Sequence, residues 1–303
     1  MILVTGATGT VGRAVVDRLV AANVPVRALT RNPDCGLPDA VEVVVGDLGN
    51  PTDIAVAMRG VDRVFLLSTG PDIPVHDANV LHEATCAAVA HVVKLSSGRT
   101  GDDTATDPIP SWHRLGEQAL RDSGIGWTVL GPLGFMANTL HWAGSIRHQD
   151  SVFATYGHGR IAVIDEHDIA AVAAAVLTSD GHDGRTYRLS GPEALSPSEM
   201  TDTLAEVLGR PLRFVEVEPA VARQTILQHG QSEVMADAIM ALRATALESF
   251  TSTVFPTVQD ITGNRPNSFR EWAIRHRADF ENARVQGGAP RHELAFRLGA
   301  RWR

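Results

Sequence analysis

The chain of 303 residues has little cysteine, little lysine and no long apolar segment. Its two cysteines, Cys35 and Cys86, are too few for a disulfide framework and do not cluster as zinc ligands do. The longest unbroken apolar run, 169–177, is far shorter than the roughly 18 residues that a membrane span needs. We therefore expect no disulfide scaffold, no metal site and no membrane segment.

Positive charge is also scarce. The 27 Lys and Arg residues stand against 35 Asp and Glu residues, which gives a formal net charge of −8, and Lys94 is the only lysine. Nonspecific nucleic-acid binding needs a cationic surface that displaces counterions, so we expect no nucleic-acid partner. A first strand is expected from residue 2, which leaves no room for a secretory leader and favours a cytoplasmic protein.

The first half of the chain alternates between short β-rich runs and helical patterns, which is typical of a parallel, doubly wound sheet. The expected strands span 2–5, 24–29, 41–45, 61–67, 91–96 and 127–130. The expected helices span 11–22, 53–59, 74–89 and 111–122. The predicted fold class is α/β, a Rossmann-type doubly wound parallel sheet with a smaller C-terminal α+β lobe.

The pattern weakens after Pro132. Helices are expected over 135–146, 165–177, 200–208, 233–249 and 268–280, and short strands over 160–164 and 187–189. We divide the chain into a Rossmann domain of 1–133, to which 160–180 returns, a substrate-side lobe of 134–159 and 181–280, and a tail of 281–303. The tail contains an amphipathic segment, 292–302, that suits either a partner surface or a docked terminus.

A glycine-rich loop, Thr5-Gly6-Ala7-Thr8-Gly9-Thr10-Val11-Gly12, joins the first expected strand to the first expected helix. A strand before the loop, a helix after it and a second strand beyond form the context that dinucleotide binding requires. Glycines allow the sharp turn, the approach of backbone N–H groups to the pyrophosphate and close helix packing, while the helix N-terminus favours the anion. A corner without a ligand is the alternative. The predicted cofactor-binding residues are Gly6, Thr8, Gly9, Thr10, Val11 and Gly12.

The end of the second expected strand reads Thr30-Arg31-Asn32. Sites that prefer NAD place an acidic residue here for the ribose 2′-hydroxyl, whereas the guanidinium of Arg31 suits a 2′-phosphate. A solvated arginine is the alternative, and Asp34 lies nearby in the sequence. Asp47 and Leu48 are predicted at the adenine edge, with helix capping as the other interpretation of Asp47. We therefore predict NADP(H) as the cofactor.

The chain resembles the NmrA-like family, an atypical branch of the short-chain dehydrogenase/reductase superfamily. The resemblance covers roughly residues 1–280 and rests on 5–12, 30–33, 46–48, 60–62, 94–97, 123–124 with 127–130, 135–138, 164–165 with 168–170, and 189–191. It implies an extended Rossmann fold whose C-terminal part forms a small lobe over the nicotinamide. The family includes NAD(P)H-dependent quinone and triphenylmethane-dye reductases, and also redox-sensing regulators that bind the dinucleotide without turnover.

The Tyr-x-x-x-Lys proton relay of the parent superfamily is absent. Neither Tyr156 nor Tyr187 has a lysine four residues later, and the matching helix carries His113 and Glu117, which lie one turn apart. Hydride transfer itself needs only a bound cofactor aimed at an electrophile. We therefore favour an NADPH-dependent reductase of a quinone or conjugated carbonyl compound. A non-catalytic NAD(P) sensor that acts through a protein partner is the alternative.

Three polar residues are predicted near the nicotinamide, because open α/β sheets bind ligands at the carboxyl ends of their strands. Ser96 is assigned to cofactor binding. Ser97 and His113 are assigned to catalysis, either by orienting the substrate or by relaying a proton, with His113 as an acid or base near neutral pH. Hydrogen bonding within the loop and a surface or capping histidine are the alternatives.

A pocket for a small-molecule substrate is expected after the sixth strand. Phe135, Asn138 and Trp142 follow that strand and are predicted to line the pocket, although aromatic and apolar residues at helical spacing equally suit a core. A homodimer and a regulatory protein partner are further expectations that the sequence leaves open.

Overall fold

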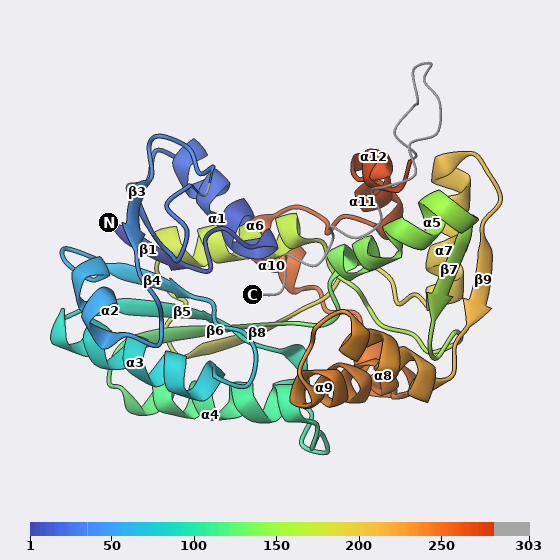
Figure 1. Cartoon of the computed structure of the whole chain (residues 1–303). Coiled ribbons are helices and arrows are strands. Elements are labelled where there is room, and N and C mark those ends of the chain that lie inside the picture. Colours follow the sequence, from blue (N-terminus) through green and yellow to red (C-terminus); the bar gives the residue numbers. More distant parts are fainter. Residues whose placement is uncertain (35, 282–303) are drawn as a thin grey trace.

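The computed structural model describes residues 1–34 and 36–281, and Figure 1 shows them as two lobes side by side. The larger lobe contains a seven-stranded sheet in the order β3-β2-β1-β4-β5-β6-β8, and every neighbouring pair is parallel. The strands are β1 (Ile2–Thr5), β2 (Val26–Thr30), β3 (Glu42–Val45), β4 (Arg63–Leu66), β5 (His91–Leu95), β6 (Gly126–Pro132) and β8 (Arg185–Leu189). The predicted fold class is confirmed.

Helices cover both faces of this sheet because its strands are apolar on both sides. Helices α1 (Thr10–Ala21), α6 (Glu166–Thr178) and α10 (Thr257–Thr262) pack over one buried cluster. Helices α2 (Pro51–Ala57), α3 (Ile73–Cys86) and α4 (Pro108–Asp122) pack over the other. The strand order reverses between β1 and β4, and ligands of doubly wound folds bind at the carboxyl ends of strands flanking such a point.

The smaller lobe is built around a two-stranded parallel sheet, β7 (Ser151–Ala154) with β9 (Arg213–Glu216). Its core lies among α5 (Ala143–Gln149), α7 (Pro197–Leu208), α11 (Phe269–Arg275) and α12 (Arg277–Phe280). Capping boxes fix the starts of α7 and α11, where Ser196 pairs with Glu199 and Ser268 with Glu271.

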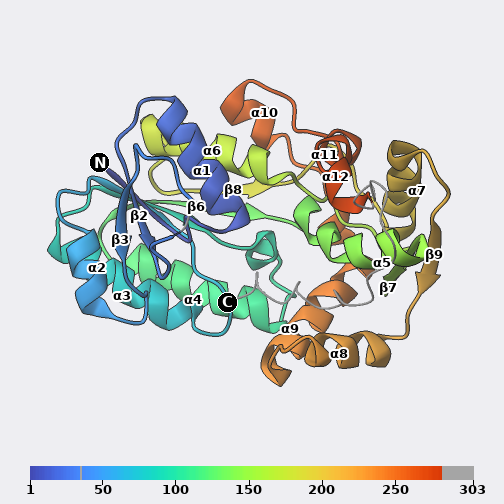
Figure 2. The ribbon, with the colours of Figure 1, turned by 45° about the horizontal axis from the view of Figure 1, so that its top comes forward.

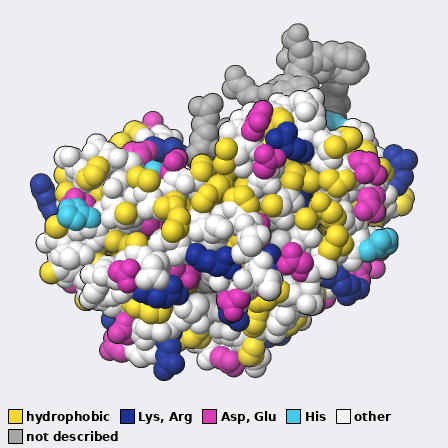
Figure 3. Space-filling model, turned by 90° about the horizontal axis from the view of Figure 1, so that it is seen from below, with side chains coloured by type: hydrophobic (Ala, Val, Ile, Leu, Met, Phe, Trp, Pro, Cys, Tyr) yellow, Lys and Arg dark blue, Asp and Glu magenta, His cyan; other side chains and the backbone are white. Residues whose placement is uncertain are grey.

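A helical hairpin and short 3₁₀ segments connect the two lobes. The hairpin consists of α8 (Pro219–Gln228) and α9 (Glu233–Ala244), followed by η3 (Thr245–Leu247) and η4 (Ser249–Ser252). Segment η1 (Gly98–Gly101) follows β5, and η2 (Met136–Trp142) follows β6. Figure 2 shows α9 next to the right-hand end of α4, on the side of the molecule away from α1. On the face seen in Figure 3, apolar side chains mix with charges of both signs.

Several predicted elements differ from the structure. Residues 160–164 form no strand and make only isolated bridges, because Arg160 N–H and Ala162 N–H donate to two separate segments, at Ala246 and Thr251. The expected helix over 135–146 divides into η2 and α5, that over 233–249 ends at Ala244, and that over 268–280 breaks at His276. Four elements were not predicted, β7, β9, α8 and α10, because none carries a long periodic apolar pattern.

Strand β8 pairs with β6 and so lies in the main sheet, within the range 181–280 that the sequence analysis assigns to the substrate side. The division of the chain into a cofactor-binding and a substrate-side lobe stays a proposal. The predicted amphipathic segment 292–302 and Cys35 lie outside the described residues. Within the described ranges, no helix is long and apolar enough to cross a bilayer, and no cluster of ligand-type side chains suits a metal ion.

Candidate active site

The glycine loop between β1 and α1 is shaped for an anion. Gly6 has φ +60°, and a Cβ on Gly12 would lie 2.1 Å from the Gly6 carbonyl oxygen, so neither position accepts a larger residue without a shift. Gly9 is the N-cap of α1, where no side chain caps the helix and the first turn carries no acidic residue. The first-turn N–H groups are therefore left for a ligand.

The predicted loop residues take two different positions. Thr8, Gly9 and Thr10 are exposed. The side chain of Val11, in the first turn of α1, is buried in the core, so only its backbone could contact a ligand. Thr5 Oγ1 fixes the neighbouring strand end, since it accepts from Leu67 N–H at 2.7 Å and donates to the Leu67 carbonyl oxygen at 2.9 Å. These bonds hold the carboxyl ends of β1 and β4 together.

Arg31 stands at the end of β2 with its side chain 62% exposed, and its Nε lies 4.0 Å from Oδ2 of Asp47. The Asp47 carboxylate accepts from Gly49 N–H at 2.7 Å. Helix α2 is capped by Asn50, whose side chain accepts from Thr52 N–H, so the capping interpretation of Asp47 is wrong. Leu48 packs at the edge of the buried cluster that α2, α3 and α4 cover. Arg31 is thus held loosely enough to turn toward a ligand.

A buried ion pair lies beneath the carboxyl ends of β4 and β5. Lys94 Nζ donates to Oδ2 of Asp77 on α3 at 2.5 Å, and both side chains are 0% exposed. Ser68, just beyond β4, donates to the other carboxylate oxygen at 2.5 Å. Gly116 on α4 closes the site, because a Cβ there would lie 2.0 Å from Asp77 Oδ2. The pair is thereby sealed between α3, α4 and the sheet.

Ser96 takes part in a second buried contact. It is 4% exposed, and its hydroxyl donates to Oε1 of Glu117 on α4 at 2.5 Å. The other Glu117 oxygen accepts from Arg121 at 2.9 Å. The Ser96 hydroxyl is therefore turned toward α4 and engaged, so that a bound cofactor would meet its backbone before its side chain.

His113 lies one turn before Glu117 on α4 and is 9% exposed. Burial, and after it the charge of Lys94, lowers the pKa of His113 to about 3. Its Nδ1 has no hydrogen-bond partner among the described residues. The expectation that His113 titrates near neutral pH is therefore wrong, because the folded chain holds the imidazole neutral at pH 7.

The remaining predicted residues mix loop, core and surface positions. Ser97 is the N-cap of η1 and accepts from Arg99 N–H at 3.3 Å, as a loop residue does. Phe135 is partly buried against the cluster that α1, α6 and α10 cover. Trp142 is 5% exposed in the core of the smaller lobe, and its Nε1 has no hydrogen-bond partner among the described residues. Asn138 is exposed.

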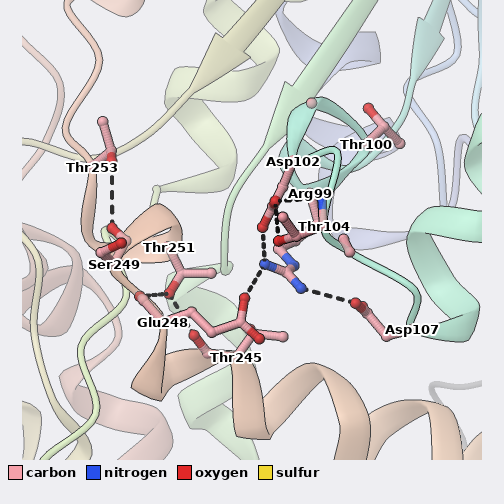
Figure 4. A network of polar contacts seen from close by, with 12 residues as sticks. Arg99, Thr100, Asp102, Thr104, Asp107, Thr245, Glu248, Ser249, Thr251 and Thr253 are labelled. Carbon is pink, nitrogen blue, oxygen red and sulfur yellow. Dashed lines mark hydrogen bonds and ion pairs between the residues drawn. The ribbon is translucent and has the colours of Figure 1, made fainter.

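Arg99 joins the two lobes and is not among the predicted site residues. It is 4% exposed and donates to Asp102 at 2.5 Å and to Asp107 at 2.9 Å, both in the loop before α4. Its third partner is Glu248, between η3 and η4, and Figure 4 shows the guanidinium between these three carboxylates. Burial by itself lowers the pKa of Arg99, but the hydrogen bonds to Asp107 and Glu248 outweigh this effect and raise the pKa.

One sequence feature points to this buried ion pair. Lys94 is the only lysine and stands in an apolar strand, which predicts a buried cation that needs an acidic partner. Nothing in the sequence indicated that Asp77 is that partner, because the two residues belong to elements that meet only in the fold.

Comparison with known proteins agrees with this geometry. Residues 6–180 match the model of a family described as NAD(P)H-binding. The chain is 44% identical to a (4-alkanoyl-5-oxo-2,5-dihydrofuran-3-yl)methyl phosphate reductase of Streptomyces griseus, over 92% of this chain and 99% of that protein. It is 36% identical to an NAD(P)H azoreductase of Xenophilus azovorans, with the same coverage of each chain.

A solved structure extends the likeness to the whole fold. The NADPH-dependent quinone oxidoreductase of Escherichia coli, determined with NADPH, superposes with a TM-score of 0.80 at 25% identity, covering 91% of this chain and 99% of that one. These relatives are named as reductases, which gives no support to the alternative of a non-catalytic sensor. The chain belongs to the NAD(P)H-binding family and is an NmrA-like, atypical member of the short-chain dehydrogenase/reductase superfamily.

Proposed function

We propose that this NAD(P)H-dependent reductase uses NADPH to deliver hydride directly to a small conjugated electrophile, such as a quinone or an α,β-unsaturated carbonyl compound. The observation that carries the proposal is the uncapped glycine turn at Gly9, which lies at the strand-order reversal together with a loosely held Arg31. The names of the relatives support a reductase of conjugated compounds.

The residues of the N-terminal half fit the cofactor. The N–H groups of 10–12, in the first turn of α1, would bind the pyrophosphate, while that of Gly9 donates to the Gly6 carbonyl oxygen and holds the turn. Arg31 would bind the 2′-phosphate with its guanidinium. Asp47 and Leu48 would border the adenine, and the backbone at Ser96 would border the nicotinamide ribose. Bound NADPH supplies the hydride, and the protein supplies position and electrostatics.

His113 acts in this proposal as a neutral hydrogen-bond donor. Hydride addition to a conjugated carbonyl compound places negative charge on its oxygen, and a neutral imidazole N–H stabilises that charge without giving up its proton. The proton that completes the reduction comes from water. Ser97, on the neighbouring loop, would orient the same oxygen. This role differs from acid–base catalysis, because the pKa of His113 is about 3.

Lys94 and Asp77 are positioning residues in this scheme. The charge of Lys94 helps to keep His113 neutral, and Asp77 holds Lys94 in place from α3. Gly116 lets α4 approach the pair closely, so the helix that carries His113 is fixed relative to the carboxyl end of β5.

The acceptor pocket belongs to the smaller lobe in this proposal. Phe135, Asn138 and Trp142 would lie along its wall, with the unpartnered Nε1 of Trp142 as a donor that a ligand would use after a small shift. We place the reaction in the cytoplasm, where reduced cofactor is regenerated. A homodimer and a regulatory protein partner stay predictions.

The decisive experiment is a titration of the purified chain with NADPH, NADH and their oxidised forms, followed by addition of a panel of quinones, azo dyes and unsaturated lactones. NADPH binding with acceptor-dependent oxidation is the expected result. Binding without turnover on any acceptor would overturn the reductase role, and failure to bind any of the four nucleotides would overturn the cofactor site.

A further inference from the structure

The two lobes are tied together on opposite sides of the molecule. One tie joins α6 of the larger lobe to α11 of the smaller lobe, and the other joins the start of α4 to the residues 245–252, which we call the connecting segment. Figures 1 and 2 both show α6 and α11 along the upper side of the molecule, and α4 and α9 along the lower side. The junction between the lobes is therefore held from two sides.

The tie at α6 is buried. Asp165, the N-cap of α6, forms an ion pair with Arg275 of α11, and the Asp165 side chain is 0% exposed. Asp168, one turn further along α6 and also buried, accepts from the backbone N–H of Asn267 at 2.7 Å and from its side-chain amide at 2.8 Å. Because buried charges are screened little by salt, this side of the junction is the fixed one.

The tie at α4 is an ion pair with one exposed arm. Arg99, in η1, is buried, and it binds Glu248 of the connecting segment, whose side chain is 46% exposed. Figure 4 shows Glu248 reaching the guanidinium from below, on the side away from Asp102. Water and salt therefore compete with this tie more than with the tie at α6.

Glu248 is not needed to neutralise Arg99. Asp102 and Asp107 bind the guanidinium at 2.5 and 2.9 Å, and their side chains are nearly as buried as that of Arg99. Among the described residues, Oδ2 of Asp107 has no hydrogen-bond partner, so an acceptor oxygen remains in the network if Glu248 is withdrawn. Two carboxylates already compensate a single buried cation. The bond to Glu248 therefore serves to link two segments.

Arg99 is connected to the residues that are proposed to act on the acceptor. Its backbone N–H donates to Oγ of Ser97 at 3.3 Å. Its partner Asp107 is the N-cap of α4, the helix that carries His113. The guanidinium is thus held by the same two elements, η1 and the start of α4, that hold Ser97 and His113.

The connecting segment is in turn bonded to the smaller lobe. Its carbonyl oxygens accept from the backbone N–H groups of Arg160 and Ala162, at 2.7 and 2.8 Å. Between these two residues, Ile161 exchanges two backbone hydrogen bonds with Leu195, directly before α7. A displacement of Glu248 is therefore transmitted to the lobe in which the acceptor pocket is proposed.

We propose that Glu248 is a positioning residue, whose ion pair with Arg99 is a releasable clasp between the lobes that sets the affinity for the hydride acceptor. This inference rests on the proposed reductase function, because it concerns the acceptor. The closed clasp holds the pocket of the smaller lobe against the helix of His113. When the clasp opens, the lobes stay joined at α6 and α11 and the pocket widens. The proposed NADPH contacts lie in the larger lobe, so NADPH affinity is independent of the clasp.

The kinetic test compares the wild-type chain with Glu248→Gln, using a neutral naphthoquinone at low ionic strength. We expect the KM for the quinone to rise about 3- to 10-fold, the size of a partly exposed charge-assisted bond, while kcat and the Kd for NADPH stay unchanged. Glu248→Asp keeps the charge and recovers part of the affinity. Added salt should raise the KM of the wild-type chain toward that of Glu248→Gln, because salt screens an exposed pair.

A matched control is Glu206→Gln, which removes an exposed carboxylate of α7 that pairs with Arg270 inside the smaller lobe. This variant should keep the KM of the wild-type chain and its dependence on salt. An unchanged quinone KM in Glu248→Gln overturns the clasp. A parallel loss of NADPH affinity in Glu248→Gln also overturns it, because that result indicates a general structural defect.

Hydrogen exchange separates this inference from the reductase proposal, because it needs no acceptor. Amide exchange of the full chain is followed by mass spectrometry. Faster exchange in Glu248→Gln that is confined to peptides from 97–107, 159–163 and 245–252, and that is not seen in Glu206→Gln, supports the clasp even if no quinone is reduced. Exchange equal to that of the wild-type chain overturns it even if quinones are reduced. Faster exchange that extends to α6 and α11 overturns it as well, because the second tie has then opened too.

Discussion

Nζ of Lys94 lies 2.5 Å from Oδ2 of Asp77, and neither side chain reaches solvent. A buried ion pair of this kind stabilises little relative to apolar residues of the same size, but its rupture leaves an uncompensated charge in the core. The pair therefore makes the chain intolerant of single substitutions at either position, which gives a direct test of the geometry.

We expect Lys94→Met and Asp77→Leu to lower the free energy of unfolding by about 3–5 kcal/mol each, because each leaves one buried charge alone. The double variant should recover most of this loss, since no charge remains. Urea unfolding of the four proteins completes the cycle. Losses that simply add in the double variant would contradict the pairing of these two residues.

Gly116→Ala tests the close approach of α4. Alanine ordinarily favours a helix over glycine by about 1 kcal/mol. Here, however, its Cβ would lie 2.0 Å from Asp77 Oδ2, and we expect a net loss of about 1–3 kcal/mol of stability from overpacking. Gly144→Ala in α5 is the control, because nothing lies within 4 Å of its Cβ and stability should hold or rise. Thermal unfolding distinguishes the two variants.

Arg31→Ala tests the choice of nucleotide. We expect the Kd for NADPH to rise about 10- to 100-fold while the Kd for NADH changes little, because only NADPH carries the 2′-phosphate. Fluorescence titration of both nucleotides gives the ratio. Arg59→Ala, another exposed arginine of the same lobe, should leave that ratio unchanged. Equal weakening toward both nucleotides in Arg31→Ala would remove Arg31 from phosphate recognition.

The low pKa of His113 predicts a pH effect on stability. Folding lowers this pKa from 6.5 to about 3, so between these values the unfolded chain binds more protons than the folded chain. Above about pH 6.5 the imidazole is neutral in both states, and His113 does not change the free energy of unfolding with pH. Between pH 6.5 and about 3 the free energy of unfolding decreases as the pH falls. We expect His113→Gln to reduce the slope of unfolding free energy against pH by up to about 1.4 kcal/mol per unit within this window.

Urea unfolding at a series of pH values measures that slope. His158→Gln removes an exposed histidine and serves as the control. The same slope in His113→Gln and the wild-type chain would mean that His113 is not held neutral by the fold. Acceptor reduction by the wild-type chain should likewise show no inflection from His113 between pH 6 and pH 8.

The cofactor half of the fold was predictable because its signals are local. Gly6 to Gly12 lie within one strand–turn–helix unit, and the flanking apolar runs mark the strands. The state of His113 was not predictable, because its pKa depends on burial by other elements and on Lys94 across the helix–sheet interface. The segment 160–164 has the composition of a strand, but its N–H groups bond to distant segments that only the complete fold brings near.

The position of β8 has a consequence for synthesis of the chain. Strand β6 ends at Pro132, but its outer neighbour is completed only at Leu189, after η2, α5, β7 and α6 have been made. During translation, the backbone N–H and carbonyl groups along this side of β6 face no strand, and an open edge invites pairing with other chains. The nascent polypeptide is therefore prone to pair with other chains along this edge until residues 185–189 have left the ribosome.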